Sequence, residues 1–175
     1  MINIICKDDF LLKQIQSLVN QKEFHQNYLF EKFLTSLEII IDNDQIKIIV
    51  NKKSSSISLP FTLDAFYSIV IDLSSDIKIN LQGFAFYPFQ NLLRNTKKKQ
   101  CFLSNIQNII FSLLVTSSDG IEKTQVYKSI WPNNKEFSIN KLDTHLTNLK
   151  KKLKNEIDFN IQIKSHDKNI KLIID

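Results

Sequence analysis

A run of short polar side chains and lysines, between Ser138 and Lys154, is the stretch best suited to binding a charged ligand. Asn can hydrogen-bond adenine through two atoms, and Thr can contact a base edge or a thymine methyl group. Lysines neutralise phosphates, which fix the position of a protein on DNA. The polar positions that combine these chemistries are Lys141, Thr144, Thr147, Asn148, Lys150, Lys151 and Lys154. This set predicts contact with the major groove of double-stranded DNA.

An amphipathic helix is expected to position these side chains. Apolar residues recur at steps of three and four, a spacing that predicts one buried stripe behind Ser138 as N-cap. Lysines crowd the last turns, where positive charge suits the negative end of the helix dipole. An ordinary amphipathic helix with a solvated polar face is the alternative, and the helix alone does not favour DNA over it. The stripe consists of Ile139, Leu142, Leu146, Leu149 and Leu153.

Positive charge is concentrated in the second part of the chain. The 175 residues carry a net charge of +5. Residues 1–75 hold 7 Lys against 9 Asp and Glu, a net charge of −2, whereas residues 76–175 hold 16 Lys and Arg against 9, a net charge of +7. A general richness in Lys would raise the net charge of both parts equally. The asymmetry therefore predicts two units, of which the second meets a polyanion.

The composition excludes several function classes. A hydrophobic content of 43% with 13 Phe supports packed cores, and Cys6 and Cys101 lack metal-ligand spacing. With only Gly83 and Gly120, the sequence has no phosphate-cradling glycine loop. No leader and no membrane-length apolar run is visible. We therefore expect a soluble cytoplasmic protein that is not an enzyme, without catalytic residues, cofactor, metal or membrane contact.

Strands and helices are expected in both halves, with a boundary at residues 74–76. In the first half we expect strands at Ile2–Cys6, Leu37–Ile41, Ile46–Val50 and Ile57–Leu59, a polar loop at Lys52–Ser56, and helices at Phe10–Val19 and Phe61–Leu73; residues 24–35 are ambiguous. In the second half we expect strands at Ile77–Leu81, Phe84–Tyr87, Asn91–Leu93 and Gln100–Leu103, helices after the Ser104-x-x-Gln107 capping box, at Glu122–Ile130 and at Ser138–Lys154, and a hairpin of Phe159–Ile163 with Asn169–Ile174.

The second half resembles the winged-helix DNA-binding domain of OmpR/PhoB-type bacterial response regulators. The resemblance spans about residues 77–174 and rests on FLSNIQNIIFSLL, TQVYKSIWP and LDTHLTNLKKKL as its three helices. Asp143, His145, Leu149, Lys150 and Lys151 stand in the places of the family's recognition-helix signature, and a Trp-Pro pair ends the second helix. The fold class expected is thus α+β, with a C-terminal winged helix-turn-helix preceded by a small antiparallel sheet.

The resemblance implies a regulator of transcription that binds double-stranded DNA as a homodimer. The third helix would enter the major groove, and Lys164, Lys168 and Lys171 on the hairpin would meet the adjacent backbone or minor groove. The loop with Asn133, Asn134, Lys135 and Glu136 would contact RNA polymerase. Arginines usual in this recognition helix and a Gly-x-Gly-Tyr wing are absent, so no target site is predicted beyond A·T-rich DNA. For His145 and Asp143 the alternative is a structural role, with Asp143 pairing with a nearby Lys or Arg.

The first half, residues 1–75, resembles a shortened receiver domain of small α/β type. Asp8 and Asp9 follow the first strand and Asp42 follows a later one, as phosphate-accepting sites require. Leu59 replaces the lysine before Pro60, and the chain from Asp42 to Leu59 is too short for a parallel crossover. We therefore expect a phosphorylation-independent dimerisation domain, with Phe61–Leu73 as a self-association surface. A metal site at the three aspartates is less favoured than helix capping by Asp8 or Asp9 and a turn at 42–44.

Two other functions remain open at this stage. The winged helix could serve as a protein-interaction module that binds RNA polymerase or another regulator, and DNA affinity that falls steeply with salt would distinguish the two. A true phosphorelay switch would respond to acetyl phosphate with Mg²⁺ through Asp42, and no such response is expected.

Overall fold

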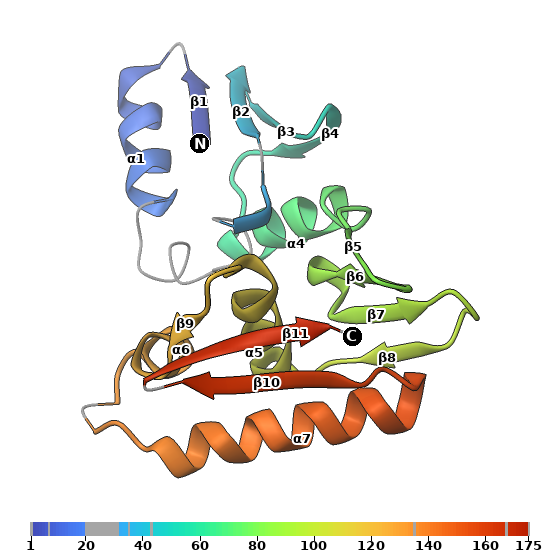
Figure 1. Cartoon of the computed structure of the whole chain (residues 1–175). Helices are drawn as coiled ribbons and strands as arrows, with labels where there is room; N and C mark the ends of the chain where they lie inside the picture. Colours follow the sequence, from blue (N-terminus) through green and yellow to red (C-terminus); the bar gives the residue numbers. More distant parts are fainter. Residues whose placement is uncertain are drawn as a thin grey trace. The chain divides into compact units, whose positions relative to one another are not determined.

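The computed structural model describes residues 2–6, 8–19, 32–34, 36–42, 44–134, 136–166 and 168–174. The chain divides into two compact units, Met1–Ile77 and Lys78–Asp175 (Figure 1). Both units combine helices with small sheets, so the fold class is α+β.

Unit 1 contains one four-stranded sheet with the order β1-β2-β3-β4. Its elements are β1 (Ile2–Cys6), α1 (Asp9–Val19), β2 (Leu37–Asp42), β3 (Gln45–Val50), β4 (Lys53–Ser58) and α4 (Leu63–Leu73). Only β1 and β2 pair in parallel, while β2, β3 and β4 form an antiparallel meander. The mostly antiparallel sheet makes the unit α+β rather than the small α/β type expected from the sequence. The sheet agrees with the expectation that no parallel crossover fits between Asp42 and Leu59.

The core of unit 1 lies between the sheet and α4. Successive side chains of β3 point to opposite faces of the sheet. Ile46, Ile48 and Val50 are fully buried on one face, and Lys47 is exposed on the other. Phe66 and Val70 of α4 are buried as well, and this helix contacts β3 and β4. Two apolar residues of the segment 61–73 thus serve the unit's own core, whereas Ile71 is 39% exposed. Self-association through this segment stays a prediction.

Local polar contacts explain how two elements of unit 1 begin. The carboxylate of Asp8 accepts hydrogen bonds from the backbone N–H groups of Phe10 and Leu11, both at 2.9 Å, so Asp8 caps α1 as expected. Thr62 caps α4 by accepting a hydrogen bond from the backbone N–H of Ala65 at 3.2 Å. Residues 20–31, most of the ambiguous segment, and the side chain of Asp42 lie outside the described residues.

Unit 2 contains two sheets and three α-helices among its described residues. Its elements are β5 (Ile79–Leu81), β6 (Phe84–Tyr87), the 3-10 helix η1 (Pro88–Gln90), β7 (Leu92–Asn95), β8 (Gln100–Phe102), α5 (Asn105–Thr116), β9 (Ile121–Glu122), α6 (Lys123–Ile130), α7 (Ile139–Ile157), β10 (Ile161–His166) and β11 (Asn169–Ile174). One sheet is the antiparallel series β5-β6-β7-β8, and the other has the order β10-β11-β9. The helix α5 contacts both α6 and α7.

Phenylalanines from separate elements form the centre of unit 2. The Phe86 ring on β6 meets Phe111 of α5 edge to face, with centroids 4.9 Å apart. Phe159 stacks on Phe84 at 3.7 Å. Phe159 was expected to begin the terminal hairpin, but β10 begins only at Ile161 because the Phe159 side chain turns into this buried cluster.

Gly120 permits a strand that the sequence analysis missed. Its φ of +95° is disfavoured for residues with a side chain, and an added Cβ would lie 3.2 Å from the carbonyl oxygen of Ile170. The close approach lets β9 pair with β11, with Ile121 opposite Ile170. The terminal hairpin is thereby tied to the start of α6, where the N–H of Lys123 donates to the carbonyl of Lys168 at 2.9 Å.

Candidate nucleic-acid interface

The helix α7 buries one side along most of its length. Leu142, Leu149 and Leu153 are fully buried, and Leu146 is nearly so. Two details differ from the expectation. Ile139, counted in the apolar stripe, is 45% exposed because it lies at the open start of the helix. Ser138 occupies the N-cap position, but its side chain makes no capping hydrogen bond there.

The opposite side of α7 presents the expected polar residues to solvent. Thr147, Asn148, Lys151 and Lys154 are exposed, while Lys150 is half-buried. Thr144 is exposed too, but its hydroxyl donates to the backbone carbonyl of Asn140 at 2.8 Å. The Thr144 oxygen is therefore left as a hydrogen-bond acceptor, and its methyl group stays available for apolar contact.

The Trp131 ring holds two residues at the start of this face. The Lys141 ammonium lies 4.1 Å from the centroid of the indole, within the range of a cation–π interaction. The His145 ring lies 5.4 Å from the same indole. Lys141 is thus partly engaged within the protein, and His145 contributes to packing between the end of α6 and α7.

An ion pair fixes α7 relative to the start of α6. Lys123 donates to a carboxylate oxygen of Asp143 at 3.0 Å, and the Lys123 side chain is only 15% exposed. The expected pairing of Asp143 with a nearby lysine is confirmed. A partly buried pair of this kind restrains orientation, which a helix inserted in a groove requires.

The loop between α6 and α7 is anchored by aromatic contacts. The Asn134 amide donates to the Tyr127 hydroxyl at 3.1 Å, and the Phe137 ring meets Tyr127 edge to face at 5.1 Å. Asn133, Asn134 and Glu136 are exposed, whereas Lys135 lies outside the described residues. Phe137 remains 44% exposed despite its contact.

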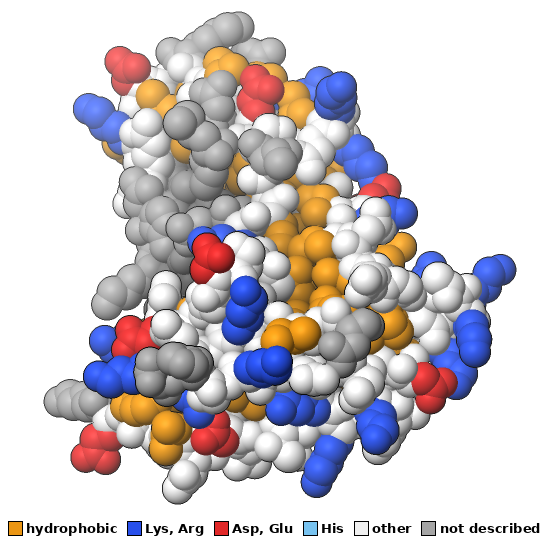
Figure 2. Space-filling model, viewed as in Figure 1, with side chains coloured by type: hydrophobic (Ala, Val, Ile, Leu, Met, Phe, Trp, Pro, Cys, Tyr) orange, Lys and Arg blue, Asp and Glu red, His pale blue; other side chains and the backbone are white. Residues whose placement is uncertain are grey.

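The β10–β11 hairpin places two lysines face to face. Lys164 and Lys171 are direct partners in the antiparallel register, and both are exposed. Like charges in this position are destabilising, by about 0.2–1 kcal/mol. Lys168 is exposed next to the hairpin turn. Figure 2 shows lysine and arginine side chains gathering along the lower and right-hand margins, where Figure 1 places α7 and the β7–β8 turn.

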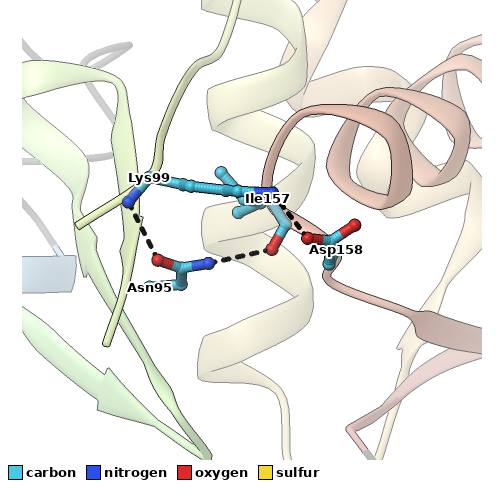
Figure 3. A network of polar contacts seen from close by, with 4 residues as sticks. All are labelled: Asn95, Lys99, Ile157 and Asp158. Carbon is cyan, nitrogen blue, oxygen red and sulfur yellow. Dashed lines mark hydrogen bonds and ion pairs between the residues drawn. The ribbon is translucent and has the colours of Figure 1, made fainter. Parts of the chain in front are cut away.

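Polar contacts with the β7–β8 turn close the C-terminal end of α7. The Asn95 amide donates to the carbonyl of Ile157 at 3.2 Å, and Lys99 donates to Asp158 at 2.8 Å (Figure 3). The hydrogen bond and the positive charge of Lys99 lower the pKa of Asp158. Asp158 itself adopts a left-handed conformation with φ of 56°, which ends the helix. Neither Asn95 nor Lys99 was among the site residues expected from the sequence.

In the described part of the chain, no group of three or more His, Cys, Asp or Glu side chains could hold a metal ion. Burial, then a hydrogen bond with Glu156, raises the pKa of the Cys101 thiol to about 12, so this buried sulfur stays protonated near neutral pH. None of the described helices has the length and apolar character needed to cross a membrane.

No protein-family model and no curated protein matches the sequence.

Proposed function

We propose that Lys78–Asp175 forms a winged-helix DNA-binding domain and that the protein regulates transcription. The observation that carries this proposal is the exposed face of α7, where Asn148 and Thr147 stand among lysines opposite a fully buried leucine stripe. Residues 78–175 hold 16 Lys and Arg against 8 Asp and Glu, a net charge of +8. A domain with this positive charge and an exposed polar helix face is suited to binding DNA, a polyanion whose base edges such a helix can contact.

The mechanism is insertion of α7 into the major groove of double-stranded DNA. Asn148 hydrogen-bonds adenine through two atoms, and Thr147 and Thr144 contact a base edge or a thymine methyl group. Lys150, Lys151 and Lys154 neutralise phosphates on either side and fix the register without reading sequence. Lys141 contributes less than expected from the sequence, because its ammonium already lies over Trp131.

The β10–β11 hairpin acts as the wing. The repulsion between Lys164 and Lys171 is relieved when a phosphate lies between them, so the bound state is favoured over the free one. Lys168 extends the same contact toward the hairpin turn. The pairing of β11 with β9 holds the wing against the start of α6.

Control by phosphorylation is not part of this proposal. In unit 1 the position before Pro60 is occupied by Leu59, which carries no charge to balance a phosphoryl group. Dimerisation through unit 1 and action in the cytoplasm stay predictions that accompany the proposed function.

A protein-interaction module is the second candidate, favoured by one specific observation. Phe137 and Ile139 are 44% and 45% exposed and lie at the end of the α6–α7 loop. Exposed large apolar residues next to one another suit a protein partner such as RNA polymerase. Binding of this kind would depend little on salt.

Selection from a pool of random A·T-rich duplexes tests the proposed function. The wild-type protein is expected to enrich a repeated motif. Asn148→Ala should relax the preference at one position of the motif, with a loss of about 1–3 kcal/mol for the preferred sequence. Lys151→Ala should weaken binding equally for all sequences, because it removes a phosphate contact only. Thermal melting of each variant checks that the fold is kept.

The outcomes separate three kinds of protein. An enriched motif that Asn148→Ala relaxes supports sequence-specific regulation. Binding without any motif would indicate an architectural DNA-binding protein and would contradict base recognition by α7. A wild-type protein that binds no duplex at low salt would contradict the proposed function and favour the interaction module.

A further inference from the structure

The lysine turn, residues Asn95–Lys99 between β7 and β8, is a basic site outside the interface described above. It carries three successive lysines, Lys97, Lys98 and Lys99, all exposed. Lys98 has a left-handed backbone with φ of 64°, and its N–H donates to the carbonyl of Asn95 at 3.0 Å. The turn is also closed by the N–H of Asn95, which donates to the carbonyl of Lys99 at 3.0 Å.

The Asn95 side chain joins this turn to the end of α7. Its oxygen accepts a hydrogen bond from the backbone N–H of Lys99 at 2.9 Å, and its nitrogen donates to the carbonyl of Ile157 at 3.2 Å (Figure 3). One amide thus bridges two elements that are 62 residues apart in sequence. The lysine turn is therefore held at a fixed place beside the last turn of α7.

The three lysines divide into two roles. Lys99 neutralises Asp158, with the two charged atoms 2.8 Å apart. Lys97 and Lys98 form no ion pair with any carboxylate in the described ranges of the chain. The hydrogen bond and charge of Lys99 lower the pKa of Asp158 most, and the charge of Lys97 contributes a smaller effect. The ion-pair partner of that carboxylate is Lys99, so the ammonium groups of Lys97 and Lys98 remain for an external anion. The lysine ammonium is a compact point charge, so it can bind a phosphate from many directions.

The length of α7 indicates which anion reaches this site. Its 19 residues span about 28 Å, whereas the major groove is about 12 Å wide. A helix of that length in the groove reaches base edges with its middle turns only, and its ends lie beside the sugar–phosphate backbone. The lysine turn is fixed at one of those ends.

We propose that Lys97 and Lys98 bind backbone phosphates of double-stranded DNA beyond the C-terminal end of α7. This inference rests on the proposed function, since it places α7 in the major groove. The contact adds affinity and widens the footprint without reading bases. The wing and the lysine turn then act on different segments of the DNA backbone.

Affinity for a fluorescent A·T-rich duplex of about 30 base pairs tests the proposal with the full-length protein. One phosphate contact changes the salt slope by about 0.9, so Lys97→Gln and Lys98→Asn should each weaken binding about eightfold at about 0.1 M salt. Asn is chosen at position 98 because it tolerates the left-handed backbone. The matched control is Lys78→Gln, which removes one exposed lysine just before β5, at the opposite end of the same sheet.

The control and a second variant keep the two proposals apart. Lys78→Gln should change affinity less than twofold, and Lys151→Gln should lower it about as much as the two turn variants do. If Lys151→Gln weakens binding but the turn variants match Lys78→Gln, the inference is wrong and the proposed function stands. If the wild-type protein shows no salt-dependent binding, both are wrong.

Discussion

At the scale of single residues, two lysines on the hairpin repel each other, and a bound anion would offset that repulsion. Lys164 and Lys171 are direct cross-strand partners, and both side chains are exposed. Their repulsion lowers the stability of the free hairpin and strengthens its attraction to phosphate. Stability and DNA affinity are therefore expected to respond in opposite directions to one substitution.

Lys164→Glu should raise the free energy of unfolding by about 0.5 kcal/mol, because a like-charged pair becomes an opposite-charged one. The same change should weaken DNA binding at least tenfold at about 0.1 M salt, since a phosphate contact becomes a repulsion. Urea unfolding and a duplex titration measure the two effects. Lys78→Glu gives the same change of charge elsewhere and should leave affinity nearly unaltered. Unchanged affinity in Lys164→Glu would remove the hairpin from the interface.

Residue positions on α7 were predictable to different degrees. The exposure of Asn148, Thr147 and Lys151 follows from helical periodicity, because the leucine stripe fixes the buried side. The contact of Lys141 with Trp131 was not predictable, since it depends on where the end of α6 meets α7. Ile139 was assigned to the stripe by spacing, but it is 45% exposed, because the described residues of unit 2 leave the first turn of α7 largely uncovered.

At the scale of elements, the end of α7 is set by its contacts with the β7–β8 turn. The pKa of Asp158 is lowered by Lys99, so the ionised carboxylate is the form that stabilises the folded state. This stabilisation is present above the pKa of the unfolded chain, about 3.9. It is lost as the pH falls through the lower pKa of the folded state.

Asp158→Asn should lower the free energy of unfolding near neutral pH and leave the left-handed backbone in place, because Asn tolerates it. The difference from wild type should be full at pH values above the pKa of Asp158 in the unfolded chain and should disappear as the pH falls through the lower pKa of the folded state. Lys99→Gln removes the same ion pair by changing its other member, and it should remove the same pH dependence of the free energy of unfolding. Urea unfolding at several pH values measures both. A difference that persists undiminished at low pH would show that the charge of Asp158 is not the cause.

Most helices and long strands were predictable, whereas elements defined by their neighbours were not. The capping box at Ser104 and Gln107 forms both of its hydrogen bonds, and α5 begins where the pattern predicts. The segment Lys53–Ser58 was expected to be a loop up to Ser56, but it is the edge strand β4, where polar residues face solvent. The two-residue β9 exists only because β11 lies beside it.

At the scale of the whole molecule, charge distinguishes the two units. Unit 2 holds all but 7 of the 23 Lys and Arg residues, and its α7, hairpin and lysine turn present many of them to solvent. The α+β class was predictable from the order of strands and helices. The antiparallel pairing of β2, β3 and β4 was also predictable, because the chain from Asp42 to Leu59 leaves no room for a parallel crossover. The full length of β4 was not, since its polar sequence gives no strand signal before Ile57.

The central claim is that unit 2 binds DNA through α7 and the hairpin. Its most direct test is the salt dependence of binding to an A·T-rich duplex. Six lysines are proposed to meet phosphates in this interface, at 150, 151, 154, 164, 168 and 171. The logarithm of affinity should therefore fall with the logarithm of salt concentration at a slope of about −5, or of about −7 when Lys97 and Lys98 of the lysine turn bind phosphates as well. Lys151→Ala should make the slope shallower by about one. A slope near zero, or no binding at low salt, would contradict the account.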